Sequence, residues 1–298
     1  LNDALQTIKE GEGKSVYPMQ LAQGSTFNGF FNNYDGLASG LQPIGVKYDD
    51  ASRKVVCTLE QDDIMDGLNW LHKWYQDGII NPDANVVTDG GKGSIFGSAQ
   101  GWPAAATTWA FNQGIEKYDL TQVFGPLYTT ETIQGSMNAI SANSKYKTEA
   151  LKVLQLMNTD PKFRDMCAYG TEGNYMEYAE DGTVQKLRDD WNWPSYTQGT
   201  FFILSTQADG DPDAWNQVKE QNESATSSTC LGFALDVTNI QNEIANCNTV
   251  WDKYKNDLLT GASDPATAVP ACIEELKAAG LDTVIEEAQK QVDEFFAN

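Results

Sequence analysis

Residues 134–166, QGSMNAISANSKYKTEALKVLQLMNTDPKFRDM, decide the fold because they combine the signals of a β-strand with those of the α-helix that follows it. Together with the residues from Val123 onward, they predict a strand, a turn, a second strand and then the helix. Ser144 is the expected N-cap of this helix, and Asp160-Pro161 is expected to interrupt it. The apolar stripe of the helix is Ala150, Val153, Leu154 and Met157. The segment therefore predicts a β-then-α unit.

A hairpin and further helices are predicted on both sides of this unit. Residues 43–58, PIGVKYDDASRKVVCT, indicate two short strands around a turn. Apolar residues from Ile64 to Tyr75 recur at helical spacing, and Asp77-Gly78 is expected to end that helix. Near the other end, three helices are expected. Their signals are the stripe Ile240, Ile244, Cys247, Trp251, Tyr254 and Leu258, caps at Asp264 or Asp282, and a stop at Gly280. The pattern is that of an α/β protein with a helical C-terminal region.

The first residues predict an amphipathic helix. Leu1, Leu5 and Ile8 share one face, and Gly11 is expected to close it. This beginning lacks the basic-then-apolar order of a signal peptide, and no run of eighteen apolar residues follows. We therefore expect a chain without a membrane-spanning helix, preceded by a further segment in the native protein.

The charge balance argues against an anionic macromolecular partner. The 298 residues contain 42 Asp and Glu against 20 Lys and Arg, a formal net charge of −22. Most of the surface would repel nucleic acid or an anionic membrane. An excess of acidic residues also keeps an exposed protein in solution, and this is the simpler interpretation of the charge.

The residues with chemical potential do not form a catalytic or metal-binding pattern. The five cysteines fall at no CxxC or Cys/His spacing, so no metal site and no cofactor is predicted. We expect most of these cysteines to be buried as small apolar side chains, with one disulfide as the alternative. The only histidine, His72, lies on a predicted helix, where a packed or edge position is expected. Paired carboxylates such as Asp49-Asp50 lie beside turns, which is typical of solvated surface. No catalytic residue is predicted, and the chain is not expected to be an enzyme.

Aromatic side chains concentrate in predicted loops, next to amides such as Gln100 and Asn192. The apolar C–H face of a sugar ring can lie on an aromatic ring, while its hydroxyls bond to amides and carboxylates. The alternative is that these aromatics only anchor long loops to the core. The candidate ligand-binding residues are Phe27, Asn28, Phe30, Tyr34, Gln100, Trp102, Trp191 and Trp193.

Among these candidates, Trp102 is expected to be a stacking platform. It follows Gly101 and precedes Pro103, which biases its backbone toward an extended turn from which the ring can project. Trp109, seven residues later on a predicted helix, has the better claim to a core position. Trp191 and Trp193 are weaker candidates, because no motif fixes them as ligand contacts.

Residues 134–166 resemble the stretch of family 1 extracellular solute-binding proteins in which a small-residue strand precedes Ser-x-Lys or Asn and a helix Glu-Ala-x-x-x-Leu. The resemblance extends along the chain and is closest to the lipoprotein branch of Gram-positive bacteria. The other blocks that carry it are GLNWLHKWYQDGIINPDA (67–84), GSIFGSAQGWPAAATTWAFN (93–112), YGTEGNYMEY (169–178), LGFALDVTNIQNEIANCNTVWDKY (231–254) and LKAAGLDTVIEEAQKQVDEFF (276–296).

This resemblance implies a two-lobed, periplasmic-binding-protein-like fold of type II, with a ligand between the lobes. Residues 1–127 would form lobe 2 and start in an inter-lobe helix. Residues 128–225 would be the remainder of lobe 1, and residues 226–298 a helical region packing on lobe 2. Relatives carry an additional N-terminal segment with a lipidated cysteine, so one lobe is expected to be incomplete at its N-terminus. Trp102 falls where sugar-binding relatives place a stacking tryptophan.

The function implied is capture of a carbohydrate, with an oligosaccharide expected, and its delivery to the transmembrane subunits of an ABC permease. A monomeric, extracellular, lipid-anchored protein is expected, with the anchor outside this chain. A secreted carbohydrate-active enzyme and a non-catalytic surface carbohydrate-binding protein are the alternatives. A neutral ligand is favoured because arginine is scarce near the loop aromatics, although Arg188 before Trp191 would suit an acidic sugar.

Overall fold

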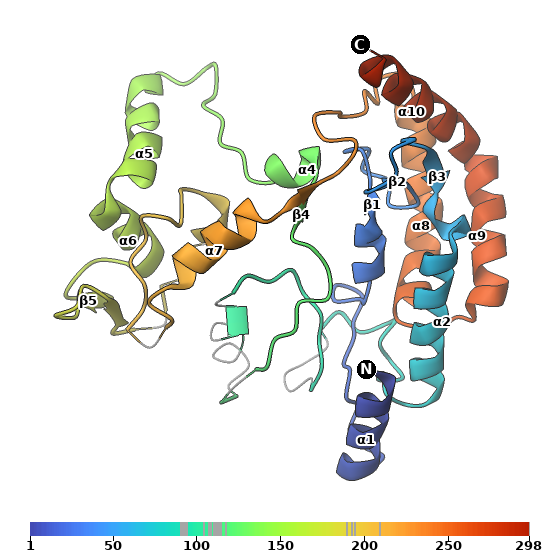
Figure 1. Ribbon diagram of the computed structural model, residues 1–298, viewed down its shortest axis with the longest axis horizontal. Helices are drawn as coiled ribbons and strands as arrows, with labels where there is room; N and C mark the ends of the chain where they lie inside the picture. The colour runs from blue at the N-terminus through green and yellow to red at the C-terminus, as the bar shows by residue number, and fades with distance from the viewer. Residues whose placement is uncertain are drawn as a thin grey trace. The chain divides into compact units, whose positions relative to one another are not determined.

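A computed structural model of the protein describes most of the chain and divides it into two compact units (Figure 1). Unit 1 comprises Leu1–Gln100, Thr129–Glu131 and Ser227–Asn298, and unit 2 comprises Gly101–Tyr128 and Thr132–Thr226. The residues described are 1–89, 95–103, 105–106, 109, 115–116, 118–188, 190–191, 193, 195–208 and 210–297, with the side chain of residue 196 excepted.

Unit 1 contains a three-stranded antiparallel sheet in the order β1-β2-β3. Its strands are β1 (Tyr34–Asp35), β2 (Ile44–Lys47) and β3 (Val55–Cys57). The β2–β3 pairing, with Ile44 opposite Cys57, confirms the predicted hairpin. Strand β1 adds to it from a stretch too polar and glycine-rich to predict a strand. An added Cβ on Gly45 would lie 2.9 Å from the backbone oxygen of Asp35, so glycine is needed where β1 and β2 meet.

The helices of unit 1 pack along this sheet, and Figure 1 shows α2 beside α8 and α9. They are α1 (Asn2–Glu12), α2 (Asp62–Gln76), α8 (Gln241–Leu259), α9 (Pro265–Ala279) and α10 (Leu281–Phe296), with the short 3-10 helices η1 (Gly29–Asn33) and η2 (Thr58–Glu60). Asp264 caps α9 by accepting a hydrogen bond from Ala266 N at 2.9 Å. Gly280 ends that helix in the left-handed region, with φ 110°. Both features confirm the predicted helix signals.

Two clusters of buried side chains form the core of unit 1. The larger cluster joins the sheet to α2, α8, α9 and α10, and the smaller joins α1 to α2 and the chain that follows it. The stripe predicted for α8 is buried except for the half-buried Tyr254, and Cys247 and Leu258 are fully enclosed. All five cysteines have free thiols, and four of them are buried. The predicted buried role of the cysteines is confirmed for these four.

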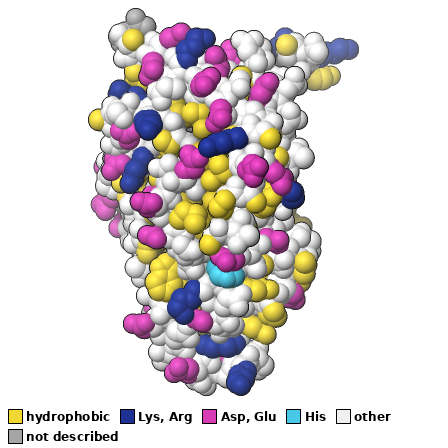
Figure 2. Space-filling view, turned by 90° about the vertical axis from the view of Figure 1, so that its right-hand side faces the viewer, with side chains coloured by type: hydrophobic (Ala, Val, Ile, Leu, Met, Phe, Trp, Pro, Cys, Tyr) yellow, Lys and Arg dark blue, Asp and Glu magenta, His cyan; other side chains and the backbone are white. Residues whose placement is uncertain are grey.

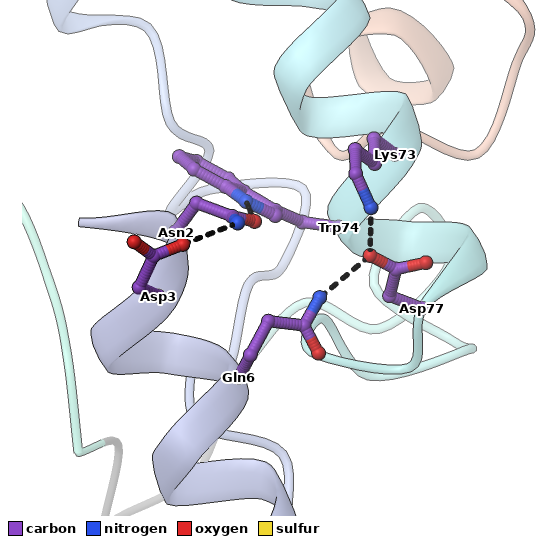
Figure 3. A network of polar contacts seen from close by, with 6 residues as sticks. All are labelled: Asn2, Asp3, Gln6, Lys73, Trp74 and Asp77. Atoms are coloured by element: carbon purple, nitrogen blue, oxygen red, sulfur yellow. Dashed lines mark hydrogen bonds and ion pairs between the residues drawn. The ribbon is translucent and has the colours of Figure 1, made fainter.

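Polar contacts complete the seam between α1 and α2 (Figure 3). Trp74 Nε1 donates to Asn2 Oδ1 at 3.2 Å, and Gln6 Nε2 donates to Asp77 Oδ2 at 2.7 Å. Lys73 also pairs with Asp77. The carboxylate at the C-terminal end of α2 therefore contacts both α2, through Lys73, and α1, through Gln6.

The turn after α8 lies tightly against α2. Gly261 has φ +80°, and a Cβ added there would lie 2.2 Å from the backbone oxygen of Leu71. His72, which follows Leu71 on α2, is half-buried, and its Nδ1 lies 2.9 Å from Gly261 O. This is the packed edge position predicted for the only histidine. Figure 2 shows that histidine in cyan on a face where acidic and basic side chains are interspersed.

Unit 2 is built from short elements around a small core. They are β4 (Leu127–Tyr128), α5 (Lys147–Thr159), α6 (Pro161–Tyr169), β5 (Met176–Tyr178), β6 (Val184–Lys186), the 3-10 helix η3 (Ser195–Thr197) and α7 (Ala214–Glu223). Helix α4 (Thr130–Ile133) and strand β7 (Thr226–Ser227), which pairs with β4, lie where the chain passes between the units. The buried apolar cluster comprises Tyr169, Met176, Val184 and Leu204.

The prediction for residues 134–166 is only partly confirmed. Helix α5 is present and ends before Asp160-Pro161, and Asp160 caps α6 by accepting from Phe163 N at 3.0 Å. The expected second strand is wrong, because no strand occurs within residues 134–146, all of which are described. The predicted cap is also wrong. Ser144 Oγ accepts from Tyr146 N at 3.1 Å, and Tyr146 is the N-cap without a side-chain hydrogen bond.

The predicted apolar stripe of α5 is only partly buried. Met157 is buried, Ala150 and Leu154 are half-buried, and Val153 is 46% exposed. The two units also do not coincide with the expected lobe boundaries, because residues 101–127 group with unit 2 and Thr129–Glu131 group with unit 1. Among the described residues, no helix is long and apolar enough to cross a membrane.

Candidate functional site

The first candidates lie in unit 1, on the segment that leads into β1. Phe27 and Phe30 are half-buried and pack together, with ring centroids 6.5 Å apart. Phe27 also meets Trp74 edge-on at 6.2 Å, and both phenylalanines pack against the smaller core cluster. Gly67 leaves room for Phe30, since an added Cβ would lie 2.8 Å from its ring. These two rings therefore anchor the segment to α2 and keep only part of their surface free.

Tyr34 is held by a carboxylate at the start of α2. Its hydroxyl donates to Asp63 Oδ1 at 2.8 Å, and Asn33 Nδ2 donates to Asp63 Oδ2 at 3.3 Å. Burial, together with the hydrogen bond to Asp63 and its negative charge, raises the pKa of Tyr34. The hydroxyl is thus committed to a structural contact. By contrast, the side chains of Asn28 and Gln100 are exposed.

Trp102 lies in unit 2 with a non-helical backbone, as its neighbours predicted. The half-buried ring meets Trp109 edge-on, with centroids 5.9 Å apart. Trp102 O accepts a hydrogen bond from Ala105 N at 2.9 Å, and a Cβ on Gly101 would lie 3.1 Å from the Trp109 ring. The two tryptophans therefore form a supported pair, with part of the Trp102 surface exposed.

The remaining candidates, Trp191 and Trp193, are half-buried in another loop of unit 2. Trp191 Nε1 donates to Cys167 O at 3.0 Å, and its ring centroid lies 5.3 Å from that of Tyr175. Trp193 Nε1 is buried and has no acceptor among the described residues. Asn192, between them, lies outside the described residues.

The arginine expected to suit an acidic ligand already has an anionic partner. Arg188 Nε donates to Asp190 Oδ1 at 2.9 Å, and Nη2 contacts the other carboxylate oxygen. This pairing raises the pKa of Arg188 and lowers the pKa of Asp190. A free cationic site for a carboxylate is therefore not available at Arg188.

Sequence reasoning missed the polar residues of α6 that hold the tryptophan loop. Arg164 and Asp165 are both fully buried. Asp165 Oδ1 accepts from Ser205 N at 2.9 Å, while Asp165 Oδ2 accepts from Ser205 Oγ at 2.8 Å and from the Tyr178 hydroxyl at 2.9 Å. An Arg-Asp pair on a short helix is typical of solvated surface. The only signal was the long loop that follows, which needs polar anchors.

Comparison with known proteins relates these observations to a family. Residues 229–297 match a family described as a domain of unknown function, DUF3502. A carbohydrate ABC transporter substrate-binding protein of Streptococcus pneumoniae is 28% identical in an alignment of 313 residues that includes 100% of this chain. The chain spans 62% of the length of that relative.

Solved structures give the same relation. The N-glycan transport solute-binding protein NgtS of Streptococcus pneumoniae matches 100% of this chain and 67% of its own, at 25% identity and a TM-score of 0.84. NgtS in complex with Man1GlcNAc matches 100% of this chain and 68% of its own, at 25% identity and a TM-score of 0.82. An HMO-binding solute-binding protein from Bifidobacterium longum infantis shares the fold, at 14% identity and a TM-score of 0.54, over 98% of this chain and 68% of its own.

These matches confirm the predicted solute-binding-protein fold, a mixed α/β fold with a helical C-terminal region, over the part that the chain spans. The relatives themselves are described as a substrate-binding protein and a solute-binding protein of transport systems. In sequence and fold, the chain is thus similar to carbohydrate substrate-binding proteins of ABC transporters.

Proposed function

We propose that this protein captures an oligosaccharide for import by an ABC transporter. The observation that carries the proposal is the match of the whole chain, in sequence and fold, to a carbohydrate substrate-binding protein and to NgtS. NgtS has been solved in complex with Man1GlcNAc and with Man5GlcNAc. Mannose- and N-acetylglucosamine-containing oligosaccharides are therefore the first ligands to test.

Trp102 is the proposed stacking surface for a sugar ring in unit 2, because Trp109 supports it and part of its surface stays exposed. Trp191 and Trp193 are proposed as further aromatic contacts from the same unit. In unit 1, Asn28 and Gln100 offer exposed amides, whereas Phe27, Phe30 and Tyr34 support the segment that carries Asn28. A neutral ligand agrees with the pairing of Arg188 to Asp190 and with the net charge of −22.

The proposed partners are the transmembrane subunits of the permease. We propose that the protein is a monomer outside the cytoplasmic membrane, held there by a lipid anchor. The expected lobes were residues 1–127 with 226–298, and residues 128–225. Because residues 101–127 group with unit 2, we place this stretch in the second lobe.

Isothermal titration calorimetry tests the function. We expect saturable one-to-one binding to Man1GlcNAc or Man5GlcNAc, and no heat with a panel of unrelated peptides of similar mass. Binding to peptides but to no glycan would overturn the proposal. The same glycans, incubated with the protein and then analysed by mass spectrometry, should be recovered intact. Cleavage at an enzymatic rate would instead identify a carbohydrate-active enzyme.

A further inference from the structure

The loop that carries Trp191 and Trp193 is clamped by one buried guanidinium. Arg164 Nη2 donates to Ser195 O at 2.9 Å, and its Nε donates to Thr200 O at 3.0 Å. These two carbonyl groups stand at either end of the segment that contains η3. One planar side chain therefore fixes both ends at once, a geometry that only the fork of arginine provides.

The clamp is tight on every described side. Thr200 N donates to Asn158 Oδ1 at 3.1 Å, so the same residue is held through both of its backbone groups. Gly199 has φ +76°, and an added Cβ would lie 3.0 Å from Arg164 Nε and 2.9 Å from Met157 O. The guanidinium carbon of Arg164 also lies 5.4 Å from the centroid of Phe201. The loop could not close on α6 this way with a larger residue at position 199.

Arg164 takes part in none of the ion pairs in the described part of the chain. The carboxylate of its neighbour Asp165 instead accepts hydrogen bonds from Ser205 and Tyr178. Arg164 Nη1 is buried and has no acceptor among the described residues. Burying a guanidinium without an anionic partner carries a desolvation cost, which the hydrogen bonds of Nε and Nη2 to the loop carbonyl groups offset.

The segment beside the clamp holds the tryptophans. Ser195 N donates to Trp193 O at 2.8 Å, which links the clamped carbonyl directly to Trp193. Trp191 is fixed by its bond to Cys167 O, on the same helix as Arg164. Helix α6 thus holds the Trp191 ring directly and, through Ser195, the backbone at Trp193.

We propose that Arg164 is a positioning residue for saccharide binding: its fork presents Trp191 and Trp193 in one arrangement before the ligand arrives. The inference rests on the proposed function, because it assigns these rings to the ligand. A loop that is ordered in advance loses less conformational entropy on binding, and this raises affinity without a direct contact.

A ligand-free measurement on the wild-type protein tests the clamp itself. The chain contains three arginines, so ¹⁵N-arginine labelling gives three Nε–H signals by NMR. The Arg164 signal, assigned by its loss in Arg164→Lys, should exchange with solvent far more slowly than that of the exposed Arg188. Exchange as fast as that of Arg188 would overturn the inference, whether or not any glycan binds.

The variants then test the effect on binding. Arg164→Lys keeps the charge but can reach only one carbonyl group, so Kd for Man5GlcNAc should rise about tenfold. Hydrogen exchange of the amides of residues 195–204 should become faster. Arg188→Lys, the same change at an exposed site of the same unit, should alter neither. Gly199→Ala, which presses on Arg164 Nε, should reproduce both effects with the arginine retained.

The outcomes separate the two proposals. Wild-type protein that binds no glycan contradicts the proposed function, while the arginine exchange still decides the clamp. Arg164→Lys or Gly199→Ala binding as tightly as wild type contradicts the positioning role. If Arg164→Lys fails to fold, as judged by circular dichroism, the wild-type exchange and Gly199→Ala decide it.

Discussion

The two units bury their apolar side chains to very different extents. Unit 1 encloses two clusters, in which residues such as Leu68 and Leu71 are fully buried. The buried apolar cluster of unit 2 has only four members, and most of the exposed large apolar side chains among the described residues lie on this unit, for example Leu151 and Met137. Unit 1 is therefore stabilised chiefly by apolar burial, whereas unit 2 depends on polar anchors such as those of α6.

The largest test of this contrast compares two leucines. Leu68→Ala removes a fully buried side chain from unit 1 and should lower the free energy of unfolding by about 2–5 kcal/mol. Leu151→Ala removes one that is 59% exposed on α5 and should change it by less than about 0.5 kcal/mol. Urea unfolding followed by circular dichroism measures both. An equal loss in the two variants would show that α5 is covered in solution, and would break the contrast.

A second comparison concerns aromatic rings. Phe30→Ala should destabilise unit 1 by about 2–3 kcal/mol, because the ring fills the space above Gly67. Trp102→Ala in unit 2 should instead weaken oligosaccharide binding by about 1–3 kcal/mol and leave the melting temperature nearly unchanged. Trp70→Ala, which removes another exposed tryptophan, serves as the control and should preserve affinity. A large drop in melting temperature of Trp102→Ala with intact affinity would assign Trp102 to packing.

The smallest effect on the free energy of unfolding is expected when a buried tyrosine hydroxyl is removed. This effect should be similar in the two units. The hydroxyls of Tyr34 in unit 1 and Tyr178 in unit 2 each donate to an aspartate, and burial is the largest cause that raises the pKa of each. The folded protein therefore holds these protons more tightly than the unfolded chain does. Their contribution is complete below the ordinary tyrosine pKa of about 10, and stability should fall as the pH rises above it.

Tyr34→Phe and Tyr178→Phe should each cost about 1 kcal/mol at neutral pH and reduce the alkaline loss of stability. Thermal unfolding between pH 8 and 11 measures this loss. Unchanged alkaline slopes in both variants would contradict the assignment of these protons to the two aspartates.

The same contrast separates what the sequence could predict from what it could not. The hairpin, α2 and the C-terminal helices have alternating or helical apolar spacing with caps, and these local signals suffice because each element buries its own apolar face. Around residues 134–146 the same kind of apolar spacing failed, since no neighbouring strand pairs with the segment in the structure. A β-strand needs hydrogen bonds to a neighbouring strand. When that neighbour is distant in sequence, the local residue pattern does not show whether it is present.

The candidate site shows the same limit. The extended setting of Trp102 followed from Gly101 and Pro103, its immediate neighbours. The pairing of Arg188 with Asp190 was also within reach, because the two residues are only two positions apart. Arg164 was not, since its acceptors lie 31 and 36 residues further along the chain.

The five unpaired thiols have a practical consequence. Burial raises the pKa of Cys57, Cys230 and Cys247 to about 11 and that of Cys272 to about 12, so at neutral pH these four are protonated and enclosed. Cys167 is half-buried, and its backbone oxygen accepts a hydrogen bond from Trp191 Nε1. A maleimide dye added under native conditions should thus react first at Cys167, giving a fluorescent reporter next to the tryptophan loop without cysteine engineering.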